Sequence, residues 1–270
     1  MTSSAGDERG EEAAMFYENH PVYVEQRLKL EPTFAGKSAQ IATQFHQFRQ
    51  EVAPVSHNKV WEKDIIAEND NVQIISNWAS FDVLQYQDKP ARAGMSMLHL
   101  LAIPREAIIN GVYLTDRNVS VIDEMIHLFE ETWAKPEKQD EILQHQITAI
   151  DRRAKNMEGE PFAKQAHEAA RAHYDELVAM VKGGPGLGVG DFQYGLHLRP
   201  DNSADYLHLH IIAAPYEYRK YSTSEHDKKT KDAVEVRDFI IQDARTSGGG
   251  SSRTPSISDE AGFRSRVDPI

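Results

Sequence analysis

The chain has 270 residues, 40% of them hydrophobic, and a formal net charge of −12. It contains no cysteine, which excludes disulfides, thiol nucleophiles and thiolate-bound zinc. The negative charge disfavours binding of nucleic acid over the whole surface, because such binding depends on Lys and Arg side chains that neutralise phosphates.

Nothing in the chain resembles a membrane or secretion segment. No stretch approaches the roughly 20 apolar residues that cross a bilayer. The first ten residues lack the basic and then apolar pattern of a signal peptide. We therefore expect a protein of the cytoplasm or nucleus that has no membrane partner.

The ends of the chain differ in composition from its middle. Residues 1–14 are small, polar and charged, and residues 246–270 are rich in Ser, Gly and Pro, so both are predicted to be disordered tails. Residues 15–56 are predicted to form a helical N-terminal extension, with Ile41, Phe45, Phe48 and Val52 on one face. Residues 57–245 are the predicted main domain.

Period-two patterns in the main domain predict an antiparallel sheet of about five strands. The first three strands are expected at 72–75, 81–86 and 97–103, with a loop over 87–95 and with Pro104 ending the third strand. Two more are expected at 192–198 and 206–212. Strands combined with separate helices predict the α+β class.

A helical insertion is predicted over residues 120–182. Its first helix has a possible capping box at Ser120 and Asp123, and two further helices begin near Pro136 and Pro161. The apolar face of the first helix comprises Ile122, Met125, Ile126, Phe129 and Trp133. After a polar loop at 216–229, a final helix with Ala233, Val236, Phe239 and Ile240 on one face closes the domain.

The strand predicted at 206–212 carries the main functional signal. Leu207, Leu209 and Ile211 form an aliphatic face that should pack into the core. His208 and His210 alternate with these residues, so both imidazoles should point to the opposite face, where a ligand can reach them.

Three interpretations fit two histidines at this spacing. They could bind zinc together with a third histidine such as His99. A neutral imidazole could instead attack an acyl or phosphoryl centre and form a covalent intermediate. Alternatively, both could be polar residues on the exposed face of a sheet. Spacing alone does not decide among these interpretations.

The run Tyr206-Leu-His-Leu-His-Ile-Ile212 resembles the His-φ-His-φ-His-φ-φ signature (φ, apolar) of the histidine triad superfamily, with Tyr206 at the first His position. Members of this superfamily are nucleotide hydrolases and transferases. Asp88-Lys-Pro and the run His99-Leu-Leu-Ala-Ile-Pro104 resemble the upstream strand-loop-strand of the superfamily. The run Phe192-x-x-Gly195-x-His197-x-x-Pro200, followed by Ser203, looks most like the aprataxin branch. The cysteines of aprataxin's zinc finger are absent.

The resemblance implies an α+β fold of the histidine triad type and a mechanism centred on His208. This residue would attack the α-phosphorus of a nucleotide and carry a transient nucleotidyl group. Imidazole suits the role because its ordinary pKa near 6.5 leaves it largely neutral at pH 7. The backbone carbonyl of Tyr206 would accept the proton of its other ring nitrogen, and His210 would bind the non-bridging phosphate oxygens.

The resemblance also implies a set of substrate-binding residues. His99 would lie beside the two strand histidines, Ser203 would donate to phosphate, and Asp88 would accept from ribose hydroxyls. His197 would contact phosphate if two residues are inserted before the histidine strand. Tyr206, which replaces the first histidine, would lower or alter the activity.

The expected partner is a nucleotide or nucleotide conjugate, and the mechanism requires no metal or other cofactor. The basic loop with Arg219, Lys220, Lys228 and Lys229 suggests an adenylated nucleic-acid end as a further partner, although the missing zinc-finger cysteines argue against this role. Either a monomer or a homodimer fits the sequence. The alternative function is nucleotide binding or scaffolding with little turnover, which the replacement by Tyr206 favours.

Overall fold

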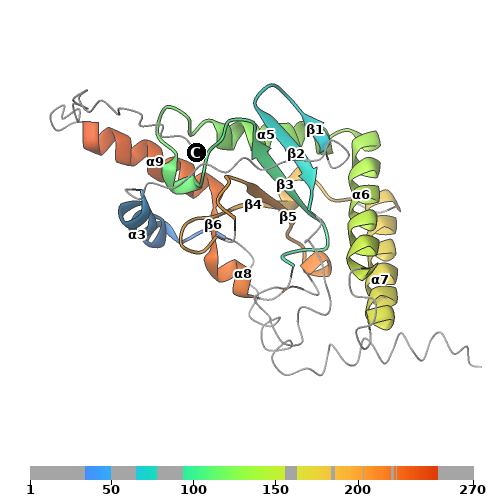
Figure 1. The fold of residues 1–270 in the computed structure, drawn as a ribbon. Helices are drawn as coiled ribbons and strands as arrows, with labels where there is room; N and C mark the ends of the chain where they lie inside the picture. The colour runs from blue at the N-terminus through green and yellow to red at the C-terminus, as the bar shows by residue number, and fades with distance from the viewer. Residues whose placement is uncertain are drawn as a thin grey trace, which may run out of the picture.

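A six-stranded antiparallel sheet forms the centre of the protein in a computed structural model (Figure 1). The structure describes residues 34–49, 65–77, 94–155, 163–183, 186–202, 204–219, 222 and 224–248. The strand order is β1-β2-β3-β5-β4-β6. The strands are β1 (Ile65–Glu68), β2 (Val72–Ser76), β3 (His99–Pro104), β4 (Phe192–His197), β5 (Leu209–Ala213) and β6 (Thr230–Asp232).

Helices pack around this sheet, so the fold belongs to the predicted α+β class. They are α3 (Ser38–Phe48), α5 (Val121–Trp133), α6 (Pro136–Lys155), α7 (Ala163–Gly183), α8 (Ser224–Lys229) and α9 (Ala233–Gly248), with 3-10 turns at Gly111–Tyr113, Val189–Asp191 and Tyr216–Arg219. The residues predicted as a helical insertion form α5, α6 and α7. None of the described helices is long and apolar enough to span a membrane.

The strand predictions are confirmed in four places, at β2, β3, β4 and β5, although β5 begins at Leu209 and not at Tyr206. Strand β3 ends at Pro104, as predicted. Strands β1 and β6 were not predicted, because four and three residues are too short to establish a period-two pattern. The strand predicted at 81–86 and nearly all of the loop at 87–95 lie outside the described residues.

One predicted tail and one predicted helix start differ from the structure. Helix α9 continues to Gly248, beyond the predicted start of a disordered tail at residue 246. The rest of that tail and residues 1–14 lie outside the described residues. The predicted capping box at Ser120 is wrong, because the backbone of Ser120 is already helical (φ −57°, ψ −20°) and its side chain makes no capping hydrogen bond.

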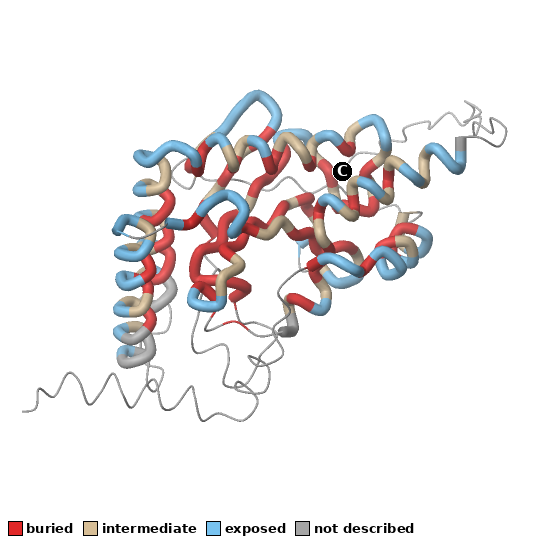
Figure 2. The backbone as a smooth tube through the Cα atoms, turned by 180° about the vertical axis from the view of Figure 1, so that it is seen from behind, coloured by how far each residue is buried: buried red, intermediate tan, exposed pale blue. Residues whose placement is uncertain are grey.

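The two faces of the sheet are covered differently. Leu209 and Ile211 point into the large core beneath α5 and α9, whereas Ile212 packs with Phe34 and Met95 in a small separate cluster. The predicted alternation of the histidine strand is therefore confirmed. Figure 2 shows that buried residues concentrate on the strands, while the outer turns of the helices are exposed.

The segment 216–229, predicted as a polar basic loop, instead forms a 3-10 turn and α8. Arg219 is 2% exposed, donates to Met95 O at 3.0 Å and forms an ion pair with the buried Asp227. The prediction that Arg219 contributes to a basic patch is wrong, because its guanidinium is buried and its charge is paired with the carboxylate of Asp227. Lys220 lies outside the described residues, and Lys228 is exposed.

Gly195 offers a test of how tightly the second face is packed. A Cβ atom on Gly195 would overlap Thr230 Cγ2 and lie 3.0 Å from the Phe34 ring. We predict that Gly195→Ala lowers the free energy of unfolding by about 1–3 kcal/mol, because overpacking forces neighbouring side chains to move. Urea unfolding measures this change. Gly190→Ala is the control, since its Cβ would meet nothing within 4 Å, and equal losses in both variants would contradict the prediction.

Candidate active site

Strands β3, β4 and β5 bring His99, His197 and His210 to one face of the sheet, and His208 lies directly before β5. In the strand register, Leu101 and Gly195 lie opposite His210, and His99 lies opposite Ile212. His210 is the centre of the group. Its ring centroid lies 4.2 Å from that of His197, 4.8 Å from that of His208 and 5.1 Å from that of His99. The predicted neighbourhood of His99, His208 and His210 is therefore confirmed, and His197 joins it.

His208 is held in one tautomer by the backbone. Its Nδ1 lies 2.6 Å from the carbonyl oxygen of Tyr206, the contact that the sequence predicted. Because a carbonyl only accepts hydrogen bonds, Nδ1 carries the proton and Nε2 has a free lone pair. Burial lowers the pKa of His208, the hydrogen bond to Tyr206 opposes this shift, and Lys229 adds to it. The ring is therefore neutral at pH 7.

A chain of hydrogen bonds fixes the tautomer of His210. The amide nitrogen of Asn77 lies 3.0 Å from His99 Nδ1 and 3.3 Å from His99 Nε2. Because Nε2 also lies 2.9 Å from His210 Nδ1, we assign the Asn77 hydrogen bond to Nδ1, which accepts, and the proton of His99 to Nε2. His99 Nε2 lies 2.9 Å from His210 Nδ1 and donates to it. The proton of His210 is consequently on Nε2. Side chains from the turn after β2 and from two strands thus determine which nitrogen of the central ring is a donor.

His210 Nε2 has no hydrogen-bond partner among the described residues, although His210 is only 7% exposed. Leaving a buried donor unpaired costs about 1–3 kcal/mol, and native proteins rarely tolerate this without a reason. The unpaired N–H lies on the same side of the sheet as the lone pair of His208. A ligand with an electrophilic centre and an oxygen acceptor would engage both groups.

Burial keeps the other rings neutral as well. It lowers the pKa of His99 to about 3, with smaller contributions from His226, His208 and Arg219. Burial also lowers the pKa of His210 and of His197 well below the ordinary value, and neighbouring rings and Lys229 strengthen the shift at His197. The site at pH 7 is therefore a group of neutral imidazoles whose donors and acceptors are fixed by their neighbours.

His197 uses its ring proton within the protein. Its Nε2 lies 2.9 Å from Thr230 Oγ1, and the Thr230 hydroxyl donates to His226 O at 2.6 Å. Since that hydroxyl has one proton, Thr230 must accept from His197 Nε2, which leaves Nδ1 with a lone pair. The predicted contact of His197 with phosphate therefore cannot use this proton.

His226 was not among the site residues predicted from the sequence, but it lies on helix α8 next to the histidine group. Its ring stacks on that of His197 with centroids 5.8 Å apart. Helix α8 carries His226 and Asp227, and Asp227 pairs with Arg219 of the preceding 3-10 turn, which anchors the helix. No sequence period links α8 to the histidine strand, so only the folded chain reveals the contact. Asn77 was also missed, because a single Asn after a strand is an ordinary turn residue.

Tyr206 is anchored rather than free. It is 7% exposed, and its hydroxyl donates to Pro104 O at 2.7 Å. The hydroxyl thus ties the segment just before β5 to the end of β3. As a predicted substrate-binding residue, Tyr206 contributes its backbone carbonyl to His208, while the proton of its side chain is used inside the protein.

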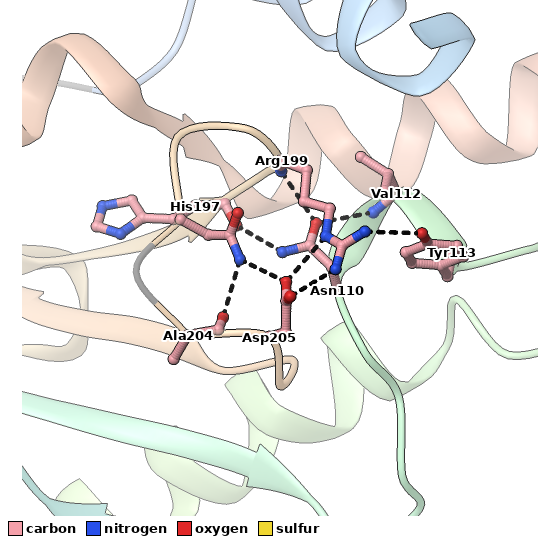
Figure 3. Close-up of polar contacts among 8 residues, drawn as sticks. Asn110, Val112, Tyr113, His197, Arg199, Ala204 and Asp205 are labelled. Carbon is pink, nitrogen blue, oxygen red and sulfur yellow. Dashed lines mark hydrogen bonds and ion pairs between the residues drawn. The ribbon is translucent and has the colours of Figure 1, made fainter. Parts of the chain in front are cut away.

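A polar network holds the loop between β4 and β5 (Figure 3). The Asn110 side chain donates to His197 O at 3.2 Å and accepts from Arg199 N at 3.2 Å. Arg199 Nε donates to Asp205 Oδ1 at 2.9 Å. This network fixes both ends of the loop that contains Ser203. Ser203 itself and Asp88 lie outside the described residues, so their predicted roles stay predictions.

A metal could also be held here. One ring nitrogen from each of His197, His208 and His210 lies within 4.8 Å of the others. The set differs from the zinc site considered from sequence, in which His99 was the third ligand. His99 instead faces Asn77 and His210 with its two nitrogens.

Comparisons with protein-family models, curated proteins and solved structures found no match. The resemblance to the histidine triad superfamily therefore depends on the motif residues themselves.

The lowered histidine pKa values predict how stability depends on pH. Below pH 6.5 the histidines of the unfolded chain bind protons, whereas the buried rings of the folded protein stay neutral. The free energy of unfolding therefore falls as the pH falls toward the folded-state pKa, which is about 3 for His99. Each such ring contributes up to about 1.4 kcal/mol per pH unit. Urea unfolding between pH 7.5 and pH 5 measures this slope.

The matched variants are His99→Gln, which removes one buried titrating ring, and His46→Gln, which changes an exposed one. We expect a smaller slope in the first variant and the wild-type slope in the second. Identical slopes in all three proteins would show that the buried rings do not carry the pH dependence.

The anchoring role of Tyr206 can be tested by removing its hydroxyl. Tyr206→Phe should lower the free energy of unfolding by about 0.5–1.5 kcal/mol, because the hydrogen bond to Pro104 O is lost. The same urea titration of wild type and variant measures this loss. A Tyr206→Phe protein as stable as wild type would contradict the anchoring role.

Proposed function

We propose that this protein is a nucleotide phosphohydrolase or nucleotidyltransferase of the histidine triad type, which acts at the α-phosphate of a nucleoside monophosphate conjugate. The observation that carries the proposal is the pairing of two groups: the lone pair on His208 Nε2 and the buried, unpaired N–H on His210 Nε2. The first suits attack on phosphorus, and the second suits a phosphate oxygen.

In the first step, His208 Nε2 attacks the α-phosphorus and forms a P–N bond. The bond from phosphorus to the leaving group breaks, and the leaving group departs with the electron pair and takes a proton from solvent. The imidazole becomes positively charged while it holds the nucleotidyl group. The Tyr206 carbonyl, 2.6 Å from Nδ1, stabilises this charge through the remaining N–H.

His210 stabilises the charge that develops on the phosphoryl oxygens. Its Nε2–H donor is aligned before the substrate arrives, because His99 fixes the opposite nitrogen at 2.9 Å. A preorganised donor in a buried site is worth more than the same donor in water, and removal of one such donor typically costs about 100-fold to 1000-fold in kcat.

In the second step, water attacks phosphorus and the P–N bond breaks. The electron pair returns to His208 Nε2, the water loses a proton to solvent, and the nucleoside monophosphate leaves. Transfer to an acceptor other than water follows the same course. Neither step needs a metal, because the neutral imidazole is the nucleophile and N–H groups bind the oxygens.

Substrates that fit this chemistry are an adenylated amine, a dinucleoside polyphosphate and a capped nucleotide. Lys229 lies close enough to His197 and His208 to lower the pKa of both rings, so its positive charge would favour a phosphate-containing ligand. An adenylated nucleic-acid end has weaker support as a substrate, because Arg219 is paired with Asp227 inside the protein.

The first test replaces the nucleophile. With an adenosine phosphoramidate as substrate, His208→Ala should lower kcat by at least about a thousandfold, because the variant lacks the nitrogen that forms the P–N bond. Rapid quenching and intact-protein mass spectrometry should find AMP on the wild-type chain and not on the variant. His46→Ala, at an exposed site on α3, is the matched histidine control and should behave as wild type.

Equal background turnover by wild type and His208→Ala would overturn the catalytic proposal. If nucleotide still bound to both proteins, the alternative of a binding protein with little turnover would be supported. One observation favours this alternative. Tyr206 stands at the position of the first triad histidine, and its buried hydroxyl already donates its proton to Pro104 O.

A further inference from the structure

The three nitrogens of His197, His208 and His210 have a chemistry that phosphate binding does not use. His197 has its lone pair on Nδ1, because Nε2–H donates to Thr230 at 2.9 Å. His208 has its lone pair on Nε2. Phosphate oxygens are acceptors and gain nothing from a second acceptor, so the lone pair of His197 has no role in the proposed reaction.

Metal ions use such lone pairs. Zinc binds neutral imidazole nitrogens at about 2.0–2.1 Å, which places the nitrogens of a tetrahedral site about 3.3 Å apart. One ring nitrogen from each of the three histidines lies within 4.8 Å of the other two, so closure around an ion needs shifts of about 1.5 Å at most. Thr230 and the Tyr206 carbonyl hold the outer nitrogens of two rings, as partners of metal-bound histidines commonly do.

We propose that His197, His208 and His210 form a three-nitrogen site for Zn²⁺, and that the ion competes with the phosphate substrate for this pocket. The competition follows because His208 Nε2 cannot bind an ion and attack phosphorus at the same time. The competition rests on the proposed function, whereas the metal binding does not.

Metal binding requires a change in the hydrogen-bond chain behind His210. When Nε2 binds the ion, its proton must be on Nδ1, so His99 Nε2 becomes the acceptor and His99 Nδ1 becomes a donor. Asn77 then has to present its amide oxygen in place of its nitrogen, which now lies 3.0 Å from Nδ1. Rotation of the Asn77 amide therefore separates a phosphate-binding state from a metal-binding state.

Zinc titration of the full chain in the presence of a chromophoric chelator tests the site without any nucleotide. Wild type should bind one equivalent of Zn²⁺, and His197→Ala should weaken the binding by at least about tenfold, the lower range for loss of a supporting residue. Circular dichroism verifies that the variant is folded. His46→Ala should bind as wild type. Equal affinity in wild type and His197→Ala, or no binding by wild type, would overturn the proposal.

Asn77→Asp tests the switch from the opposite direction. A carboxylate can only accept, so it favours the proton on His99 Nδ1 and the lone pair on His210 Nε2. We expect tighter Zn²⁺ binding and weaker AMP binding than in wild type. Weaker Zn²⁺ binding in a folded Asn77→Asp protein would contradict the switch.

The competition is measured with the adenosine phosphoramidate. Zn²⁺ should raise the apparent KM of wild type and leave kcat unchanged, whereas activation by Zn²⁺ would overturn the competition. Failure of the proposed function would look different: Zn²⁺ would still bind through His197, but the protein would not release AMP.

Discussion

The hydrogen bond from His99 Nε2 to His210 Nδ1 determines the chemistry of the site. It crosses from β3 to β5, it is 2.9 Å long, and Asn77 fixes its direction from behind. Because a neutral imidazole has a single proton, satisfying one nitrogen of His210 decides the state of the other. Antiparallel pairing of β5 with β3 and β4 provides the geometry, since it places alternate residues of three strands on one face.

Burial then determines the protonation states of the four histidine rings. Removal from water lowers the pKa of all four rings, so they act as fixed donors and acceptors at pH 7 and not as cations. The cost is stability, because a buried donor is left unpaired on His210. Gly195 lies opposite His210 in the strand register, and Asn110 holds the backbone at His197. Residues at functional sites often carry such a local cost, which the rest of the fold offsets.

Sequence patterns predicted the parts of the site that depend on local period. The alternation from Leu207 to Ile212 predicted the two faces of the histidine strand, and the motif around it predicted the Tyr206 carbonyl contact. Contacts made by isolated residues could not be predicted in this way. The site also contains Asn77 from the turn after β2 and His226 from the short helix α8, which the Arg219–Asp227 pair anchors. Neither the turn nor the short helix carries a periodic signal. Strands β1 and β6 were missed because they are too short.

The most direct test of this account is the protonation state of the individual rings at pH 7. Long-range ¹H–¹⁵N correlation spectra of the histidine side chains, assigned with single His→Gln variants, distinguish the two neutral tautomers from the charged ring. The account predicts a proton on Nδ1 of His208 and on Nε2 of His210, with both rings neutral. A charged His208, or a His208 ring with its proton on Nε2, would remove the nucleophilic lone pair and contradict the central claim.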